Sequence, residues 1–153
     1  MPTTNLEFEP WSAAEHGRLS SIVEATYAET LDCPALDGIR NVEDVLAGYR
    51  LTGVFDPRRW LIVRRKGMDV GCLILADFPV QDTWELVYMG VVREARGRGW
   101  GRQIARRAQW MAGLSGRLRL VLAVDARNTP ALKMYAAAGF QEWDQRSVYG
   151  KAY

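Results

Sequence analysis

The segment spanning residues 93–101 reads REARGRGWG, and it limits the folds open to this chain more than any other feature. It follows Trp84–Val92, a stretch rich in β-branched and aromatic residues that predicts a strand. It precedes an arginine-rich stretch that predicts a helix up to Ser115. Three glycines within five residues allow the backbone to turn sharply between the two. The sequence therefore predicts a strand, a glycine turn and a helix in direct succession.

This glycine turn is suited to binding an anion. Its glycines let the main chain approach a ligand without a Cβ in the way, and N–H groups at the helix start favour negative charge there. Arg96, Arg98 and Arg102 can add charge-assisted hydrogen bonds to phosphate oxygens. The dinucleotide pattern G-x-G-x-x-G is not matched, and no GK[ST] follows for a nucleotide triphosphate with magnesium. The turn is therefore predicted to bind a phosphate of another kind.

The charge of the chain is concentrated around this turn. Residues 93–119 hold eight arginines against one acid, Glu94, which gives +7, and the total of +2 leaves −5 for the remainder. A local basic island indicates an anionic partner held at one place, rather than a protein coated for nucleic acid. A nucleic-acid-binding domain that uses residues 93–119 stays open as an alternative, and it predicts binding that falls steeply with salt.

Length and composition predict one domain over residues 1–153, with 48% hydrophobic and 25% charged residues. The longest apolar runs, such as Cys72–Ala76, are too short to cross a bilayer. The first ten residues lack the basic and apolar regions of a secretory signal, so we expect a cytoplasmic protein that does not contact a membrane. Two cysteines and one histidine provide neither a disulfide framework nor zinc-ligand spacing, so no metal is expected.

Capping residues predict where the other helices begin and end. The tetrapeptide Ser12–Glu15 predicts a capping box that opens a helix running to about Thr30. Asn41 predicts the N-cap of a second helix, which ends at Arg50. Pro130 at a first helical position is expected to open the final helix, and Gly139 is expected to end it.

Alternation of apolar and polar residues predicts the strands. Lys66-Gly67 is expected to be the turn of a β-hairpin. With the helices, the order of elements describes an α+β fold with a mixed central sheet. The expected strands are Asn5–Glu9, Trp60–Arg64, Val70–Ala76, Trp84–Val92, Arg119–Val124, Phe140–Trp143 and Ser147–Tyr153.

Two motifs in this order resemble those of the GNAT N-acetyltransferase superfamily. The first is R-x-x-G-x-G, present as Arg96, Gly99 and Gly101. The second begins 32 residues after Arg96 and comprises Asn128, Ala131, Tyr135 and Gly139-Phe140. The resemblance covers roughly residues 60–145. It implies a GNAT-like, mostly antiparallel central sheet with helices on both faces, and an enzyme that transfers the acetyl group of acetyl-CoA to a primary amine.

The resemblance also implies roles for individual residues. The main chain of Met89, Gly90 and Val91 would bind the pantetheine arm of acetyl-CoA. Asn128 would contact this arm or tether its loop, and Tyr135 would protonate the departing thiolate, since a phenol stays protonated at neutral pH. The pyrophosphate would be held by Arg96, Gly97, Arg98, Gly99, Trp100, Gly101 and Arg102.

The general base is open between Glu85, Asp125 and water. Enzymes of the superfamily that acetylate protein N-termini often carry a glutamate where this chain has Ala123, and Asp125 is expected on the same strand face. Glu85 is the preferred candidate, because it lies eleven residues before Arg96, where histone-acetylating members carry theirs. Apolar neighbours would raise its pKa. Alternation is expected to place it on one face with Val87, Met89 and Val91.

The sequence does not identify the acceptor amine. Asp32, Asp37 and Tyr88 are candidates to line its pocket, and the acids of the segment 31–59 favour a cationic acceptor. Cys33 is expected to be an ordinary loop thiol. A non-catalytic acyl-CoA-binding domain of the same fold stays open as an alternative, and the resemblance is compatible with a homodimer.

Overall fold

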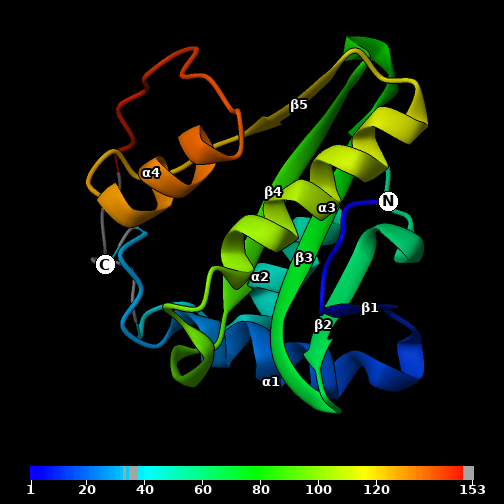
Figure 1. Ribbon diagram of the computed structural model, residues 1–153, viewed down its shortest axis with the longest axis vertical. Coiled ribbons are helices and arrows are strands. Elements are labelled where there is room, and N and C mark those ends of the chain that lie inside the picture. The colour runs from blue at the N-terminus through cyan, green and yellow to red at the C-terminus, as the bar shows by residue number, and fades with distance from the viewer. Residues whose placement is uncertain (33, 35–37, 150–153) are drawn as a thin grey trace.

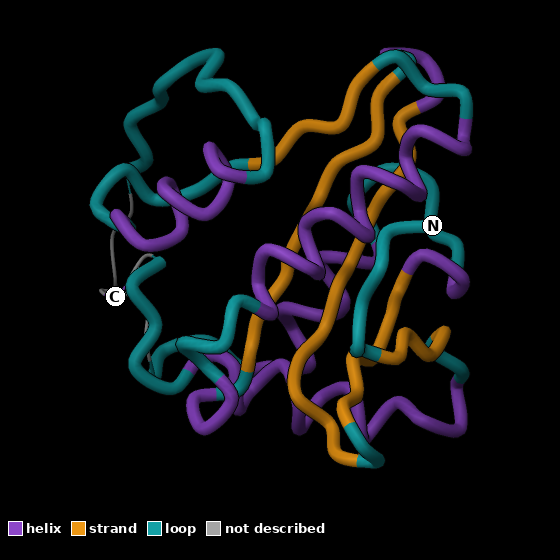
Figure 2. Tube along the Cα trace, in the orientation of Figure 1, coloured by secondary structure: helices purple, strands orange, loops and turns teal. Residues whose placement is uncertain are grey.

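The computed structural model describes residues 1–32, 34 and 38–149, and its centre is one five-stranded sheet (Figures 1 and 2). Neighbouring strands follow the order β1-β2-β3-β4-β5, with three antiparallel pairings and a parallel pairing of β4 with β5. The predicted mixed, mostly antiparallel sheet is therefore confirmed. The strands are β1 (Glu7–Pro10), β2 (Trp60–Arg65), β3 (Met68–Phe78), β4 (Thr83–Val91) and β5 (Arg119–Leu122).

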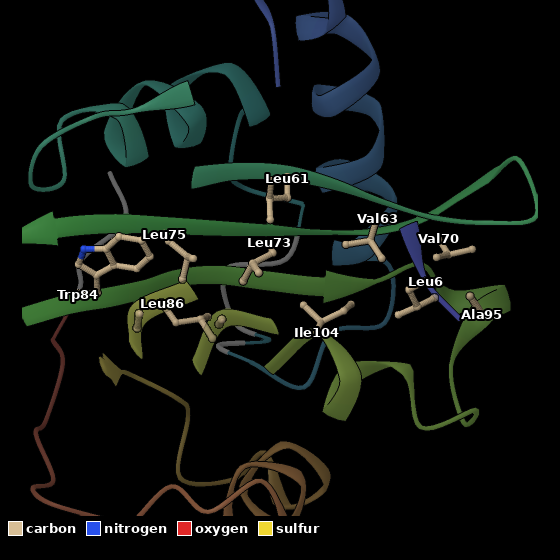
Figure 3. Packing of buried hydrophobic residues seen from close by; sticks show 12 residues of the cluster. Leu6, Leu61, Val63, Val70, Leu73, Leu75, Trp84, Leu86, Ala95 and Ile104 are labelled. Atoms are coloured by element: carbon tan, nitrogen blue, oxygen red, sulfur yellow. The ribbon is translucent and has the colours of Figure 1, made fainter. Parts of the chain in front are cut away.

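Helices cover both faces of this sheet (Figure 1). On one face, Leu19 and Leu46 pack against Cys72 of β3. On the other, Ile104 packs with Leu73 of β3, in the cluster drawn in Figure 3. Since successive residues of β3 point to opposite faces, each face has its own core. The helices are α1 (His16–Tyr27), α2 (Val42–Arg50), α3 (Trp100–Ser115) and α4 (Thr129–Ala137), and short 3-10 turns cover Ala13–Glu15, Pro57–Arg59, Pro79–Gln81 and Arg93–Ala95.

Local signals for caps and turns are confirmed with one exception. Asn41 accepts hydrogen bonds from the first turn of α2, at 2.8 Å from the Glu43 nitrogen. Lys66 and Gly67 both have positive φ, as a two-residue type I′ hairpin turn requires. The predicted capping box is wrong, because the Ser12 side chain makes no cap hydrogen bond. A 3-10 turn precedes α1 instead, and in it the main-chain carbonyl of Ser12 accepts from the Glu15 nitrogen.

A β-bulge changes the phase of β4. Ile74 of β3 pairs with Tyr88, but its neighbour Leu75 pairs with Leu86, so Val87 has no opposite residue. The side chains after Val87 therefore point to the opposite sheet face from the one that strict alternation along β4 would give them. Met89 and Val91 consequently join the core beneath α3, while Val87 and Tyr88 join the core beneath α1 and α2.

The two closing strands are wrong as far as the structure describes them. Residues 140–149 form no strand, and residues 150–153 of the second predicted strand lie outside the described residues. The reason lies at the end of α4, where Gly139 donates to Ala136 and Phe140 donates to the Tyr135 carbonyl. This is a Schellman motif, and the Phe140 ring completes it by packing edge-on against Tyr135, with ring centres 5.6 Å apart. Phe140 therefore caps a helix instead of opening a strand.

Candidate active site

The candidate site lies where β4 and β5 separate, after Leu86 and Leu122, and this separation of the two strands is the opening of the site. The two strands pair only over Thr83–Leu86 and Arg119–Leu122, and β5 then turns away toward α4 (Figure 1). Within the described chain, the part of β4 from Val87 to Val91 has a strand partner on its β3 side alone. The main-chain groups on the opposite edge of this part are thus available to an extended ligand arm, except the Val91 carbonyl, which accepts from Arg96 at 3.1 Å. Met89, Gly90 and Val91, the residues predicted to bind such an arm, lie in this part of β4.

Gly90 also has a structural reason to be glycine. A Cβ on Gly90 would lie 2.6 Å from Cβ of Thr26, so α1 packs directly on β4 at this point. Thr26 donates to the Val23 carbonyl at 2.6 Å, and its hydroxyl lies 2.7 Å from that of Tyr88. The glycine therefore faces α1, and the ligand arm would meet only the edge of the strand.

The glycine turn gives α3 an open N-terminus. Gly97 and Gly99 have φ near +75°, a region that favours glycine, at +76° and +74°. Gly99 is the N-cap and supplies no side chain, so no side-chain cap occupies the first N–H groups of α3. The first N–H with a helical partner is that of Gln103, at 3.4 Å from the Gly99 carbonyl. The N–H groups of residues 100–102 are therefore free to bind an anion, with the helix dipole in favour.

The three arginines of the turn have different surroundings. Arg98 is exposed, and its guanidinium lies 5.3 Å from the centre of the Trp100 ring. Arg102 is exposed on the first turn of α3. Arg96 instead directs its guanidinium at main-chain carbonyls of α1 and β4, at 2.9 Å from the Thr26 oxygen. Arg98 and Arg102 thus present charge beside the free N–H groups, and Arg96 does not.

Tyr135 lies on α4, across the opening from β4. Its ring is half-buried against the core beneath α3, and burial together with the negative charge of Asp32 raises the pKa of its phenol to about 12. The phenol therefore keeps its proton throughout the neutral range. Within the described residues its hydroxyl makes no hydrogen bond. Asn128 is the N-cap of the same helix and accepts from Ala131 at 3.3 Å, so it orients α4.

Glu85 and Asp125, the two candidate bases, lie in unlike places. Burial raises the pKa of Glu85, which has no ion pair or hydrogen bond among the described residues. Of its three predicted neighbours on one strand face, Val87 is confirmed and the other two are wrong, because the bulge moves Met89 and Val91 to the other face. Asp125 follows the end of β5 instead of lying in it, and its carboxylate accepts from Arg127 at 2.9 Å.

A cluster of tyrosines that the sequence did not reveal lies between α1, α2 and β4. The Tyr27 and Tyr49 hydroxyls lie 3.0 Å apart, and the Tyr49 ring stacks on Tyr88 with centres 5.8 Å apart. Only Tyr88 was predicted, because Tyr27 and Tyr49 lie at positions typical of helix cores. Asp32 is beside them, and its carboxylate accepts from the Asp125 nitrogen at 2.7 Å. Burial, with a smaller contribution from the charge of Asp32, raises the pKa of Tyr88. Cys33 and Asp37 lie outside the described residues.

No group of three or more His, Cys, Asp or Glu side chains among the described residues is arranged to hold a metal ion. Nor does any helix in that part of the chain have the length and apolar character needed to cross a membrane.

Comparison with known proteins agrees with this architecture. One relative is mycothiol acetyltransferase of Arthrobacter sp. (strain FB24), 37% identical over 71 residues, which cover 43% of this chain but only 20% of the relative. The chain thus matches about a fifth of the length of that relative. YycN of Bacillus subtilis shares the fold at a TM-score of 0.68 and 22% identity, covering 97% of this chain and 99% of its own. Aminoglycoside N-acetyltransferase AAC(6')-Iy, solved in complex with CoA, shares the fold at a TM-score of 0.67 and 15% identity. The similarity covers 98% of this chain and 97% of that protein.

The family model described as "Acetyltransferase (GNAT) family" matches residues 23–140, a range that begins within α1 and ends at the cap of α4. This range contains β4, the glycine turn and Tyr135, so the match includes every part of the candidate site described above. The chain therefore belongs to the GNAT acetyltransferase family.

Proposed function

We propose that this chain is an acyltransferase that moves the acetyl group of acetyl-CoA to a primary amine. One observation carries the proposal: the open start of α3, the free part of β4 and α4, which carries Tyr135, meet at Gly101, where an added Cβ would lie 3.8 Å from Cε of Met89 and 3.9 Å from Cε of Met134. Each of these suits one part of acetyl-CoA, namely the pyrophosphate, the pantetheine arm and the thioester. A relative in fold that was solved with CoA supports the same co-substrate.

The residues fit the pyrophosphate by charge and by geometry. The free N–H groups at the start of α3 point outward, and exposed Arg98 and Arg102 stand beside them. A Cβ at Gly97 or Gly99 would meet no atom within 4 Å, so these glycines serve the left-handed backbone that shapes the turn. Acetyl-CoA supplies the activated thioester, and the residues of the chain supply binding and proton transfer.

Tyr135 and Glu85 are proposed to move the two protons of the reaction. The amine nitrogen forms a bond to the acetyl carbon as the C–S bond breaks, and Tyr135 donates its phenolic proton to the departing sulfur. Glu85 accepts the proton that the amine loses, directly or through water. Its raised pKa suits it to this role, and its carboxylate has no partner among the described residues, whereas that of Asp125 is bonded to Arg127.

Contacts within the fold weigh against the nucleic-acid alternative. Arginines of the basic island are engaged inside the chain: Arg93 pairs with Glu29 at 3.1 Å, and Arg117 with Asp77 at 2.8 Å. Arg96 binds main-chain carbonyls. Two of the eight arginines are thus paired with carboxylates and a third is directed at main-chain oxygens, while Arg98 and Arg102 are exposed at the start of α3.

A thiol-release assay with acetyl-CoA and pooled amines tests the proposal. Release of free CoA that depends on both the enzyme and an amine, with the acetylated amine identified by mass spectrometry, is the expected result. Tyr135→Phe is the matched variant, because it keeps the ring and removes only the hydroxyl. CoA binding without release from any pool would favour the non-catalytic acyl-CoA-binding alternative.

A further inference from the structure

The guanidinium of Arg96 connects two segments that are distant in sequence. Its Nε donates to the Val91 carbonyl at 3.1 Å, at the end of β4. Its Nη2 donates to the Thr26 carbonyl at 2.9 Å, and its Nη1 to the Glu29 carbonyl at 3.5 Å. All three nitrogens therefore face main-chain oxygen atoms, two of them at the end of α1.

The end of α1 is a favourable place for such a side chain. The last carbonyls of a helix lack partners within the helix, and the dipole makes this end negative. Arg96 satisfies one of these carbonyls and brings a positive charge to it. Arg93 makes a second link between the same segments through its ion pair with Glu29.

The segment that Arg96 holds leads directly to the cluster of tyrosines. Thr26 and Tyr27 contact Tyr88 of β4, with the Tyr27 and Tyr88 ring centres 5.3 Å apart. A few residues later, Asp32 reaches across and accepts from the Asp125 nitrogen. The glycine turn thus fixes the end of α1 through Arg96, and the loop after β5 fixes Asp32.

We propose that Arg96 is a positioning residue, which fixes the acceptor side of the site, formed by the end of α1, Tyr88 and Asp32, against the glycine turn. Its guanidinium does not bind pyrophosphate. The inference rests on the proposed function, because it assigns the two sides of the opening to an amine and to acetyl-CoA. Arg96 and Arg98 thus have different roles, although both belong to one turn of six residues, Arg96–Gly101. The guanidinium of Arg98 stacks on Trp100 and is free to meet a phosphate.

The test compares Arg96→Gln and Arg96→Lys with the matched control Arg98→Gln. CoA affinity is measured by calorimetry, and hydrogen exchange is followed at two reporter amides, Thr30 and Asp125. Thr30 donates to the Tyr27 carbonyl, and Asp125 donates to Asp32. The Val54 amide, which donates to Asp77 at 2.8 Å, reports on unfolding elsewhere.

Arg96→Gln is expected to speed exchange at Thr30 and Asp125 at least tenfold, to leave Val54 unchanged, and to alter the CoA Kd less than threefold. Arg96→Lys should restore part of the protection, since a lysine can still donate to one carbonyl. Arg98→Gln should weaken CoA about tenfold or more without changing exchange. With an amine found by thiol release, Arg96→Gln should raise the KM of the amine but not that of acetyl-CoA.

The inference is overturned if Arg96→Gln weakens CoA as much as Arg98→Gln does while exchange at the two reporters stays at the wild-type rate. It is equally overturned if Val54 exchanges faster along with them, since the effect would then be global. Neither result depends on turnover. Failure of the wild-type chain to bind CoA would contradict the proposed function, whereas the exchange comparison in the ligand-free protein would still judge the role of Arg96.

Discussion

Replacing Gly90 by alanine should destabilise the fold, because α1 leaves no room for a methyl group. The added Cβ would lie 2.6 Å from Cβ of Thr26, 2.8 Å from its Oγ1 and 2.9 Å from its Cγ2. Thr26 is only 3% exposed and its Cβ carries two heavy atoms, so it cannot rotate out of the way. Either the helix moves away from β4 or the threonine loses its hydrogen bonds.

The expected cost follows from these contacts. Overpacking a well-packed core costs about 1–3 kcal/mol. Loss of one of the two hydrogen bonds that the Thr26 hydroxyl makes, with the Val23 carbonyl and with the Tyr88 hydroxyl, adds about 1 kcal/mol. A total of about 2–4 kcal/mol corresponds to a fall in Tm of roughly 4–16 °C for a domain of this size.

Thermal and urea unfolding of Gly90→Ala and Gly113→Ala provide the measurement. Gly113 lies on α3, and a Cβ there would meet nothing within 4 Å. The same substitution at Gly113 should therefore raise the stability by about 0.5–1 kcal/mol, since alanine favours a helix over glycine. A Gly90→Ala variant within 0.5 kcal/mol of the wild type would refute the close packing of α1 on β4.

Three more substitutions test the chemistry of the site. Tyr135→Phe should lower kcat roughly 10²–10⁴-fold, as expected for loss of a general acid, with the CoA Kd unchanged; an unaltered kcat would remove Tyr135 from that role. Gly139→Ala should cost about 1–2 kcal/mol in urea unfolding and lower kcat, because φ is +94° at the Schellman cap that fixes Tyr135; full activity would show that the cap does not orient the phenol. Glu85→Gln should be more stable than the wild type at pH 7.5 and equal to it at pH 4, in urea unfolding. Burial raises the pKa of the Glu85 carboxyl in the folded state above the usual 4.5. The contribution of this carboxyl to folding stability is therefore complete below pH 4.5 and is lost as the pH rises through the raised pKa. A variant with the stability of the wild type at both pH values would contradict this expectation.

Features decided by neighbouring residues could be predicted from the sequence. The Asn41 cap depends on the main-chain nitrogens two and three residues further along the chain. The Lys66-Gly67 turn depends on the φ values of its own two residues. The glycine turn and the order of strand, turn and helix are of the same kind. Gly139-Phe140 could have been interpreted locally too, because an aromatic residue after a capping glycine is typical of a Schellman motif.

Features decided by distant partners could not be predicted. The bulge at Val87 depends on how β4 aligns with β3, and no residue within β4 indicates it. The partners of Arg96 at Thr26 and Glu29 lie 70 and 67 residues away. A motif arginine in a basic turn therefore suggests a phosphate ligand, although its contacts in the fold point to another role.

The central claim is that the start of α3 and the free edge of β4 bind CoA through its phosphates and its pantetheine arm. Calorimetric titration of the wild-type chain with CoA tests it most directly, with pantetheine, which lacks the phosphates, as the control ligand. The account predicts one CoA bound per chain, with a Kd between roughly 1 μM and 1 mM, and at least tenfold weaker binding of pantetheine. No heat from CoA, or equal affinity for the two ligands, would contradict it.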